Sequence, residues 1–362
     1  MANKTRMEEI AERLQRGENK QLDPRESILQ NISKGGVIPV ISSSFRIEQI
    51  FQELEKEIGP NIVEGLIKEW ARFIKYPMPD SSNLAQVAQY FFVQRNDDPS
   101  ARTGILDFLK KFLWTMANTE VEDPALAAGL RSRIEAMRFS ELVEALDYPK
   151  FPEETEDPLR LLARFPLPYY ITTSQSDFLE RALEAEGKTP RTQICFWSGE
   201  MANIRKEHRT ITEEFNASSA TPIVYHLYGL EEYPQTLVLS EDDYINFLIS
   251  IAEDTNTLNP KIPLYLRKAV GGSQLLLIGY RLDGWDFRVL FRLMMNFRID
   301  GFSPRGMLIQ LQGKEKKASN DNAIEYLKRY FGKKSFDIKW KDADLFVQKL
   351  WDDWDALRQD QS

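Results

Sequence analysis

The sequence predicts an α/β protein: a Rossmann-like parallel sheet flanked by helices, with a helical insertion. Three observations lead to this prediction. Short apolar runs rich in β-branched residues recur along the chain, helical patterns alternate with most of them after residue 168, and residues 61–164 hold helical patterns only. Regular alternation of strands and helices is typical of a parallel sheet with helices on both faces.

The first strand–helix unit lies close to the amino terminus. The segment GGVIPVIS, residues 35–42, has the pattern of a buried strand after a glycine pair. In residues 45–58, FRIEQIFQELEKEI, apolar side chains recur at helical spacing. Polar helical patterns precede this unit in residues 7–33. We therefore expect an N-terminal helical segment, residues 1–30, ahead of the first strand.

The rest of the chain divides into a cap and a sheet. Helical patterns interrupted by prolines fill residues 61–164, which we expect to form a helical insertion or cap. Residues 31–60 and 165–358 would together form the Rossmann domain. Later strands are expected at 168–173, 192–197, 221–229, 236–240, 274–280, 307–312 and 335–340, and later helices at 177–186, 241–253, 284–297, 320–331 and 342–358.

Composition excludes several classes of protein. The chain has 362 residues, 47 basic and 55 acidic, and no long basic run, so we expect no direct contact with nucleic acid. One cysteine, Cys195, and two well-separated histidines, His208 and His226, predict neither a disulfide framework nor a zinc site. No apolar run reaches about 18 residues and the amino terminus is polar, which predicts a cytoplasmic protein without a membrane partner.

Polar side chains follow four of the expected strands. In a parallel sheet the carboxyl ends of the strands meet at one edge, where ligands bind. These strand ends could therefore line one pocket; they are Ser42, Ser43 and Ser44; Thr172 to Asp177; His226 to Gly229; and Gly279, Tyr280, Arg281 and Asp283.

Three of these regions are similar to a known family. YITTSQSDFLERAL, VYHLYGLEEYPQTLVLSEDDYINFL and LLLIGYRLDGWDFRVLFRLM resemble, in order and spacing, the sequence blocks of the bacterial sirtuin-like domain, in its defence-associated branch. With the upstream VIPVIS, the resemblance spans roughly residues 30–350. It implies a Rossmann-type fold and NAD as the ligand, and often NAD cleavage by an effector of antiphage defence. It also implies a homo-oligomer or a protein partner in a defence complex.

The resemblance assigns roles to the strand ends, and the departures fall on the catalytic positions. The family's glycine-rich first loop is Ser42, Ser43 and Ser44 here. Serine hydroxyls could face a phosphate, or Ser43 or Ser44 could simply cap the helix. The family's asparagine, which helps to hold the ribose and the attacking water, falls on Ser174, and a serine lacks the donor and acceptor of an amide.

Two further substitutions follow. The aspartate two residues beyond that asparagine falls on Ser176, whereas Asp177 matches a second acidic position of the family. The family's histidine falls on Tyr228, and a tyrosine with an ordinary pKa of about 10 is a poor base near neutral pH. His226 lies two residues earlier, on the same face of the expected strand, and is either a replacement base or a hydrogen-bonded structural residue.

The remaining block keeps the family pattern. Gly279 would allow close approach, Tyr280 and Arg281 would lie on the adenosine side, and Asp283 would hold a ribose hydroxyl or cap the next helix. With Thr172, Thr173 and Asp177, these complete the implied cofactor-binding set. The zinc-ribbon cysteines of the deacylase sirtuins are absent, so we do not expect a protein deacylase.

Three functions remain open at this point. The chain could be a sirtuin-like NAD-binding domain with a degenerate catalytic site and a structural, regulatory or sensing role in antiphage defence. It could be an NAD-hydrolysing immune effector whose active site is rebuilt around Ser174, His226 or Tyr228. It could also be an interaction scaffold that binds no nucleotide. Fold alone does not choose among them.

Overall fold

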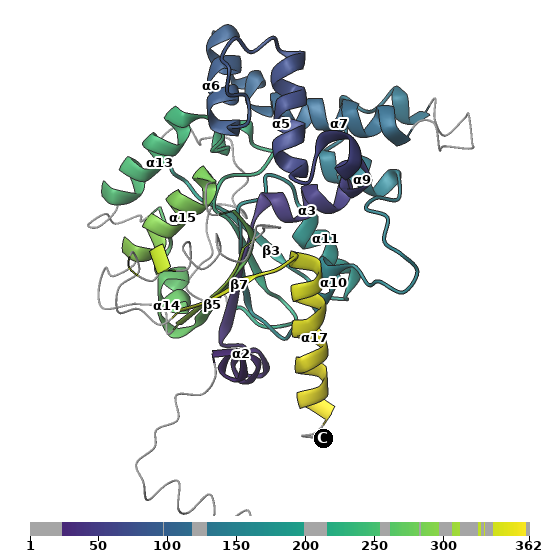
Figure 1. Ribbon diagram of the computed structural model, residues 1–362. Helices are drawn as coiled ribbons and strands as arrows, with labels where there is room; N and C mark the ends of the chain where they lie inside the picture. Colours follow the sequence, from purple (N-terminus) through teal and green to yellow (C-terminus); the bar gives the residue numbers. More distant parts are fainter. Residues whose placement is uncertain are drawn as a thin grey trace, which may run out of the picture.

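A single parallel sheet forms the centre of the protein (Figure 1). The computed structural model describes residues 24–96, 98–117, 129–198, 216–253, 261–281, 284–296, 306–311 and 336–359, with residues 325, 326 and 329. The strands are β1 (Val37–Ile41), β2 (Tyr169–Thr172), β3 (Arg191–Ile194), β4 (Ile223–His226), β5 (Gln274–Tyr280), β6 (Gly306–Leu311) and β7 (Phe336–Trp340). Their order is β3-β4-β2-β1-β5-β6-β7, all parallel, and the predicted fold class is confirmed.

The sheet separates two hydrophobic cores because successive side chains point to opposite faces. Leu276 and Ile278 of β5 belong to one core, and Leu275 and Leu277 to the other. The first core lies under α2 (Pro24–Ser33), α3 (Ser43–Ile50), α10 (Pro158–Arg164), α11 (Phe178–Ala185) and α17 (Ala343–Gln359). The second lies under α13 (Glu241–Ala252), α14 (Leu264–Gly272) and α15 (Trp285–Asn296). Burial on both faces explains why the strands are continuous apolar runs.

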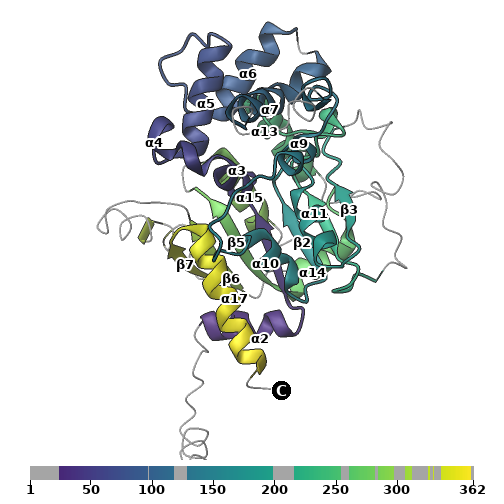
Figure 2. The same cartoon turned by 90° about the vertical axis from the view of Figure 1, so that its right-hand side faces the viewer.

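Helices stand above the carboxyl ends of the strands (Figures 1 and 2). They are α4 (Glu55–Ile58), α5 (Ile62–Phe73), α6 (Leu84–Gln94), α7 (Gly104–Ala117) and α9 (Phe139–Ala145), with short 3₁₀ turns η1 (Gln52–Leu54) and η2 (Pro99–Thr103). Trp70 of α5 and Phe139 of α9 belong to the same buried cluster as Phe45 of α3. We call these helices, α4 to α9, the cap. The cap and the first face of the sheet therefore share one continuous core.

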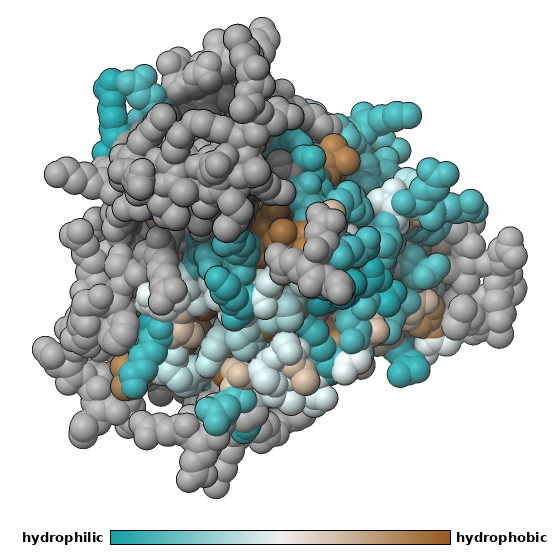
Figure 3. All heavy atoms as spheres, turned by 90° about the horizontal axis from the view of Figure 1, so that it is seen from below, coloured by the Kyte–Doolittle hydropathy of each residue, from teal (hydrophilic) through white to brown (hydrophobic). Residues whose placement is uncertain are grey.

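The carboxyl-terminal helix α17 closes the opposite end of the molecule, where it lies beside α2 in both views (Figures 1 and 2). The rings of Phe165, Trp351 and Trp354 pack with centroids 5.3–5.5 Å apart. The Trp354 indole N–H donates to the Ser33 hydroxyl at 3.0 Å. The described surface seen from below is mostly hydrophilic, with apolar residues in small patches (Figure 3).

One predicted strand is wrong. Of residues 236–240, Thr236 ends the 3₁₀ turn η3 (Pro234–Thr236), and residues 237–240 form a buried segment that joins no strand of the sheet. The Val238 N–H donates to the carbonyl of Tyr228 at 3.1 Å, and Ser240 then caps α13. The apolar pattern correctly indicated that this segment is buried, but a buried apolar segment forms a strand only when another strand lies beside it.

Other boundaries also differ from the prediction. The helix expected over residues 45–58 ends at Ile50, and α4 restarts at Glu55 after a 3₁₀ turn. Helix α14 has no counterpart in the prediction. Residues 1–23 and most of 320–331 lie outside the described residues.

The topology creates one switch point. From β1 the chain continues to β2, toward the β3 edge of the sheet. From β5 it continues to β6, toward the opposite edge, which β7 forms. Strands β1 and β5 are neighbours, paired from Val37 with Gln274 to Ile41 with Ile278. Ligands of doubly wound folds bind between the carboxyl ends of two such strands. We use the name switch-point crevice for the position where these strand ends meet, among Ser42, Thr173, Tyr280 and Asp286, which hydrogen bonds and close contacts hold together.

Candidate functional site

The polar loop after β1 forms the N-terminal cap of α3. The Ser42 hydroxyl accepts a hydrogen bond from the Ser44 N–H at 3.2 Å and donates one to the Asp286 carboxylate at 3.3 Å. The Ser43 N–H donates to the Thr173 hydroxyl at 3.2 Å. Ser42 is buried, whereas Ser43 and Ser44 are half-buried. The loop thus takes the capping role, and the first two N–H groups of α3 have partners within the protein.

The loop after β2 is held by its own hydroxyl groups. The Thr172 hydroxyl donates to the carbonyl of Ile41 at 3.2 Å and accepts from the Ser174 N–H at 3.0 Å. The Ser174 hydroxyl donates to the carbonyl of Ser176 at 3.0 Å and accepts from its N–H at 3.2 Å. Thr172 and Thr173 are buried. Ser174 therefore shapes the turn, and its single hydroxyl is engaged there.

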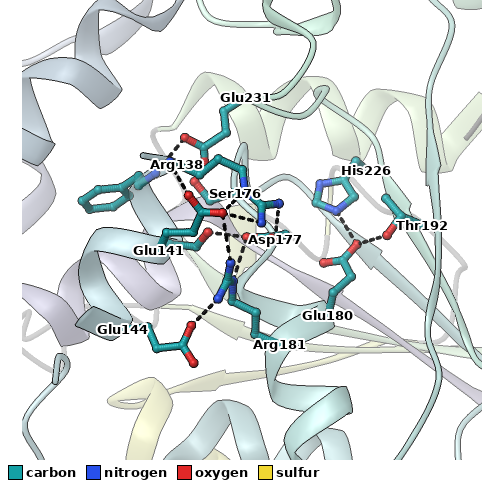
Figure 4. Close-up of polar contacts among 12 residues, drawn as sticks. Arg138, Glu141, Glu144, Ser176, Asp177, Glu180, Arg181, Thr192, His226 and Glu231 are labelled. Atoms are coloured by element: carbon teal, nitrogen blue, oxygen red, sulfur yellow. Dashed lines mark hydrogen bonds and ion pairs between the residues drawn. The ribbon is translucent and has the colours of Figure 1, made fainter. Parts of the chain in front are cut away.

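Asp177 faces the cap (Figure 4). Its carboxylate accepts hydrogen bonds from Arg138 Nη1 at 2.6 Å, from the Ser140 hydroxyl and from Arg181 Nε at 3.2 Å. Ser140 belongs to α9, Arg138 precedes that helix, and Arg181 belongs to α11. Arg138 and Ser140 tie the cap to the start of α11, and all three donors engage the carboxylate, so the geometry gives no support to the cofactor contact that the resemblance implies for Asp177.

A second acid fastens α9 to the loop after β4 (Figure 4). Glu231 accepts from the Phe139 N–H at 2.9 Å. Burial raises the pKa of Glu231 more than the Phe139 N–H and the Ser176 hydroxyl lower it. Helix α9 therefore contacts the loops that follow β2 and β4, where the resemblance places the catalytic residues.

His226 forms a buried pair with Glu180 (Figure 4). Its Nε2 lies 2.8 Å from Glu180 Oε1, and its Nδ1 lies 3.0 Å from the Ser174 carbonyl oxygen. Glu180 Oε1 also accepts from the Thr192 hydroxyl at 2.8 Å. Because both ring nitrogens face acceptors, the contacts favour the doubly protonated imidazolium. Burial acts to lower the pKa of His226, but the charge and hydrogen bond of Glu180, the Ser174 carbonyl and the charge of Asp177 together raise this pKa above its ordinary value.

Tyr228 points into the second core. Its ring packs edge-on against Tyr244, with centroids 5.5 Å apart, and against Phe247, with centroids 5.4 Å apart. Its hydroxyl donates to the carbonyl of Asp286 at 2.9 Å. Burial raises the pKa of Tyr228 well above its ordinary value, and the charge of Asp286 adds to this. This hydroxyl is fixed and stays protonated.

The expectation that His226 and Tyr228 share a face is wrong. Strand β4 ends at His226, and Tyr228 lies in the turn that follows. His226 contacts α11 on one face of the sheet, whereas Tyr228 contacts α13 on the other. The two-residue alternation holds only while the backbone stays extended.

Gly279 brings α3 close to β5. Its φ is +79°, and a Cβ at this position would lie 2.8 Å from the Cβ of Phe45. The pairing of β5 with β6 is irregular near Gly279. The Gly279 N–H donates instead to the side-chain oxygen of Gln310, Oε1, at 2.6 Å. The close approach expected of Gly279 is therefore made by a helix of the protein.

The residues after Gly279 are divided between the core and the cap. Tyr280 is fully buried, and its hydroxyl lies 3.5 Å from Thr173 Oγ1. Arg281 is half-buried and lies near α5. The hydrogen bond from Lys68 is the main cause that lowers the pKa of Glu64 on α5, and the charge of Arg281 makes a smaller contribution in the same direction. Asp283 lies outside the described residues.

The predicted site residues therefore fall into separate groups. Ser42, Ser43, Thr173 and Tyr280 meet around the switch-point crevice. Ser174 and His226 meet beside α11 instead. Sequence reasoning missed Glu180 and Asp286, which contact these two groups. Each acid interrupts an apolar helical stripe, but its partner lies 46 or 244 residues away, so no local signal could pair them.

The described residues include no group of three or more histidine, cysteine, aspartate or glutamate side chains placed to hold a metal ion. Cys195, the single cysteine of the sequence, is buried. Within the same described part of the chain, no helix combines the length and the apolar character that a membrane span needs.

Comparison with known families supports the resemblance over part of the chain. Residues 168–332 match the family model of the SIR2-like domain. The match extends from β2 past β6 and leaves out β1, α3 and the cap, whereas the resemblance extended to residue 30. No curated protein matches the chain at a significant level. The match supports a sirtuin-like, NAD-related domain, since SIR2-like domains generally bind NAD.

The residues of the switch-point crevice fit NAD poorly. A pyrophosphate needs N–H groups at a helix N-terminus, and at α3 the Ser43 and Ser44 N–H groups already donate to hydroxyls. The Asp286 carboxylate stands beside Ser42, where a second anion would be repelled.

Proposed function

We propose that this chain is a sirtuin-like domain with a degenerate catalytic site, which serves a structural, regulatory or sensing role in a prokaryotic antiphage defence system. The SIR2-like match over residues 168–332 supports the sirtuin-like, NAD-related part of this proposal. The resemblance of the three sequence blocks to the defence-associated branch supports the biological role.

The contacts of Tyr228 are the observation that carries the degenerate site. Cleavage of the nicotinamide bond needs a positioned group to orient water or a ribose hydroxyl, and misplacing such a group costs about 100-fold or more in rate. Loss of an acid–base group costs a further 100- to 10,000-fold, roughly. At the family's histidine position, the Tyr228 hydroxyl donates to a backbone carbonyl inside an aromatic cluster. It can neither accept nor relay a proton there.

The contacts of His226 argue against an NAD-hydrolysing effector with a rebuilt site. Both ring nitrogens are engaged and the ring has no exposed surface. A general base must reach the proton that it removes. Replacement of the family's base by His226 would require the Glu180 pair to break first.

The partner and the location follow from the same proposal. We propose that the domain acts in the cytoplasm, within a defence complex made with another protein or with further copies of this chain. We do not propose nucleic acid or a membrane as a direct partner, because a protein with a net charge of −8 is not strongly attracted to either of these anionic partners.

An assay of NAD loss with the purified protein, alone and with the proteins encoded beside its gene, tests the proposal. We expect turnover to be absent or very slow, with weak affinity for NAD in a parallel calorimetric titration. Ser174→Asn combined with Tyr228→His should not restore turnover, because the side chain at position 228 points toward α13.

A rapid loss of NAD with the unmodified protein would contradict the degenerate site. If His226→Ala then abolished that loss while circular dichroism showed an intact fold, the rebuilt-site effector would replace our proposal. A variant of the exposed acid Asp352, Asp352→Asn, controls for a general effect of substitution.

A further inference from the structure

The switch-point crevice contains a fixed negative charge. Asp286 lies in the first turn of α15, and its Oδ2 accepts the hydroxyl hydrogen of Ser42 at 3.3 Å. Its backbone carbonyl accepts the hydroxyl of Tyr228 at 2.9 Å. One residue of α15 therefore contacts the loop after β1 and the turn after β4.

The influence of this charge extends to three tyrosines from different elements. Burial is the first cause that raises the pKa of Tyr228, of Tyr244 and of Tyr280, and the Asp286 carboxylate raises each of them further. Tyr280 in turn lies next to Thr173, which accepts the Ser43 N–H. The carboxylate thus lies close to the groups that line the crevice.

Space beside the carboxylate is also limited. A Cβ at Gly284 would collide with Asp286 Oδ1, so the carboxylate folds back over the start of α15. On the other side of the crevice, Gly279 is already in close contact with Phe45 of α3. The Asp286 carboxylate therefore lies between the start of α15 and the residue that caps α3.

We infer that Asp286 determines the specificity of the switch-point crevice, by excluding anionic ligands such as a pyrophosphate from the N-terminus of α3. Asp286 keeps Ser42 in its capping position, where Ser42 occupies the Ser44 N–H. Its charge repels a second anion at the same place. This inference rests on the proposed function, because it explains why a sirtuin-like crevice would bind NAD weakly.

The variant Asp286→Asn removes the negative charge of this side chain and keeps its size and shape. An asparagine oxygen can still accept the Ser42 hydroxyl, and the bond from Tyr228 goes to the backbone, which the substitution leaves in place. Repulsion between charges a few ångströms apart near a protein surface changes a binding constant by about tenfold or more. Ser42→Gly is the complementary variant, since it frees the Ser44 N–H and leaves the charge.

The experiment is a calorimetric titration of the full chain with ADP-ribose, which carries the pyrophosphate but no nicotinamide bond. We expect Asp286→Asn to bind about tenfold more tightly than the unmodified protein, and this gain to shrink at high salt. Ser42→Gly should also bind more tightly. Asp352→Asn removes an equal but exposed charge on α17 and should leave the affinity unchanged.

The inference is overturned if Asp286→Asn binds no more tightly than the unmodified protein, or if neither binds ADP-ribose measurably. An equal gain in Asp352→Asn would also overturn it, because the effect would then belong to net charge. These results are separate from a failure of the proposed function, which would appear as NAD turnover and does not enter a titration with ADP-ribose.

Discussion

The Nε2 atom of His226 lies 2.8 Å from Oε1 of Glu180, and both side chains are buried. The pair joins β4 to α11, and the Thr192 hydroxyl adds β3 through the same carboxylate oxygen. Two buried charges stabilise a fold only while each keeps the other as a partner. The pair is therefore a structural element of the sheet, and several measurable consequences follow from it and from its neighbours.

Removal of one partner of this pair should strongly destabilise the protein. We expect Glu180→Ala to lower the free energy of unfolding by about 3–5 kcal/mol, because it leaves a buried imidazolium without its counter-charge. Urea denaturation measures the change. The exposed pair of Lys68 and Glu64 on α5 is a matched control, and Lys68→Ala should cost less than about 1 kcal/mol. Similar losses for the two variants would contradict a buried ion pair.

The contribution of His226 should decrease as the pH rises. Its folded pKa lies above the ordinary value of 6.5, so the folded state binds the proton more tightly than the unfolded chain. The resulting stability is fully present below about pH 6.5 and is lost as the pH rises through the folded pKa. The difference in unfolding free energy between the unmodified protein and His226→Gln should be largest near pH 6. A difference that grows toward pH 9 would show the opposite sign.

Asp344 should destabilise the protein at neutral pH. Burial raises the pKa of this carboxyl group from 3.8 to about 6, although the side-chain amide of Gln49 donates to it at 2.7 Å. The folded state therefore binds this proton more tightly than the unfolded chain, and the associated stability is lost between about pH 4 and pH 6. We expect Asp344→Asn to raise the unfolding free energy at pH 8 by about 1–2 kcal/mol, and to have little effect at pH 4. Asp352→Asn should change neither value.

Two glycines with similar backbone angles should tolerate alanine differently. Gly279 and Gly187 have φ values of +79° and +75°, but a Cβ at Gly279 would meet Phe45 whereas one at Gly187 would meet nothing within 4 Å. We expect Gly187→Ala to cost about 1 kcal/mol from the backbone alone. Gly279→Ala should cost about 2–4 kcal/mol, because the contact adds to that strain. Thermal unfolding of both variants compares them directly, and equal costs would show that α3 moves aside.

The sequence predicted the strands of the sheet better than the contacts of the site. The apolar runs at 274–280 and 307–312 correspond to β5 and β6, because a strand buried on both faces is a continuous apolar run. Residues 236–240 have the same composition and form no strand, since their neighbours in space are the end of β4 and the start of α13. Whether an apolar segment pairs as a strand depends on which segments lie beside it in the fold, and the local sequence does not contain that information.

The residues of the site were found, but their partners were not. The serine loop was predicted either to face a phosphate or to cap a helix through Ser43 or Ser44, and the residue that caps α3 is Ser42. The carboxylates that determine its surroundings and those of His226 come from α15 and α11, far away in sequence. Only the tertiary fold shows that Asp286 faces Ser42 and that Glu180 faces His226.

The bond between Trp354 and Ser33 has a consequence for the synthesis of the protein. These residues lie 321 positions apart, and the indole of Trp354 also packs against Phe165. The hydrophobic surface of α2 and α10 therefore stays uncovered on the ribosome until α17 has been made. Contacts of such long sequence separation form late and leave the nascent chain open to aggregation. A chaperone that binds apolar segments should hold this chain until α17 has emerged from the ribosome.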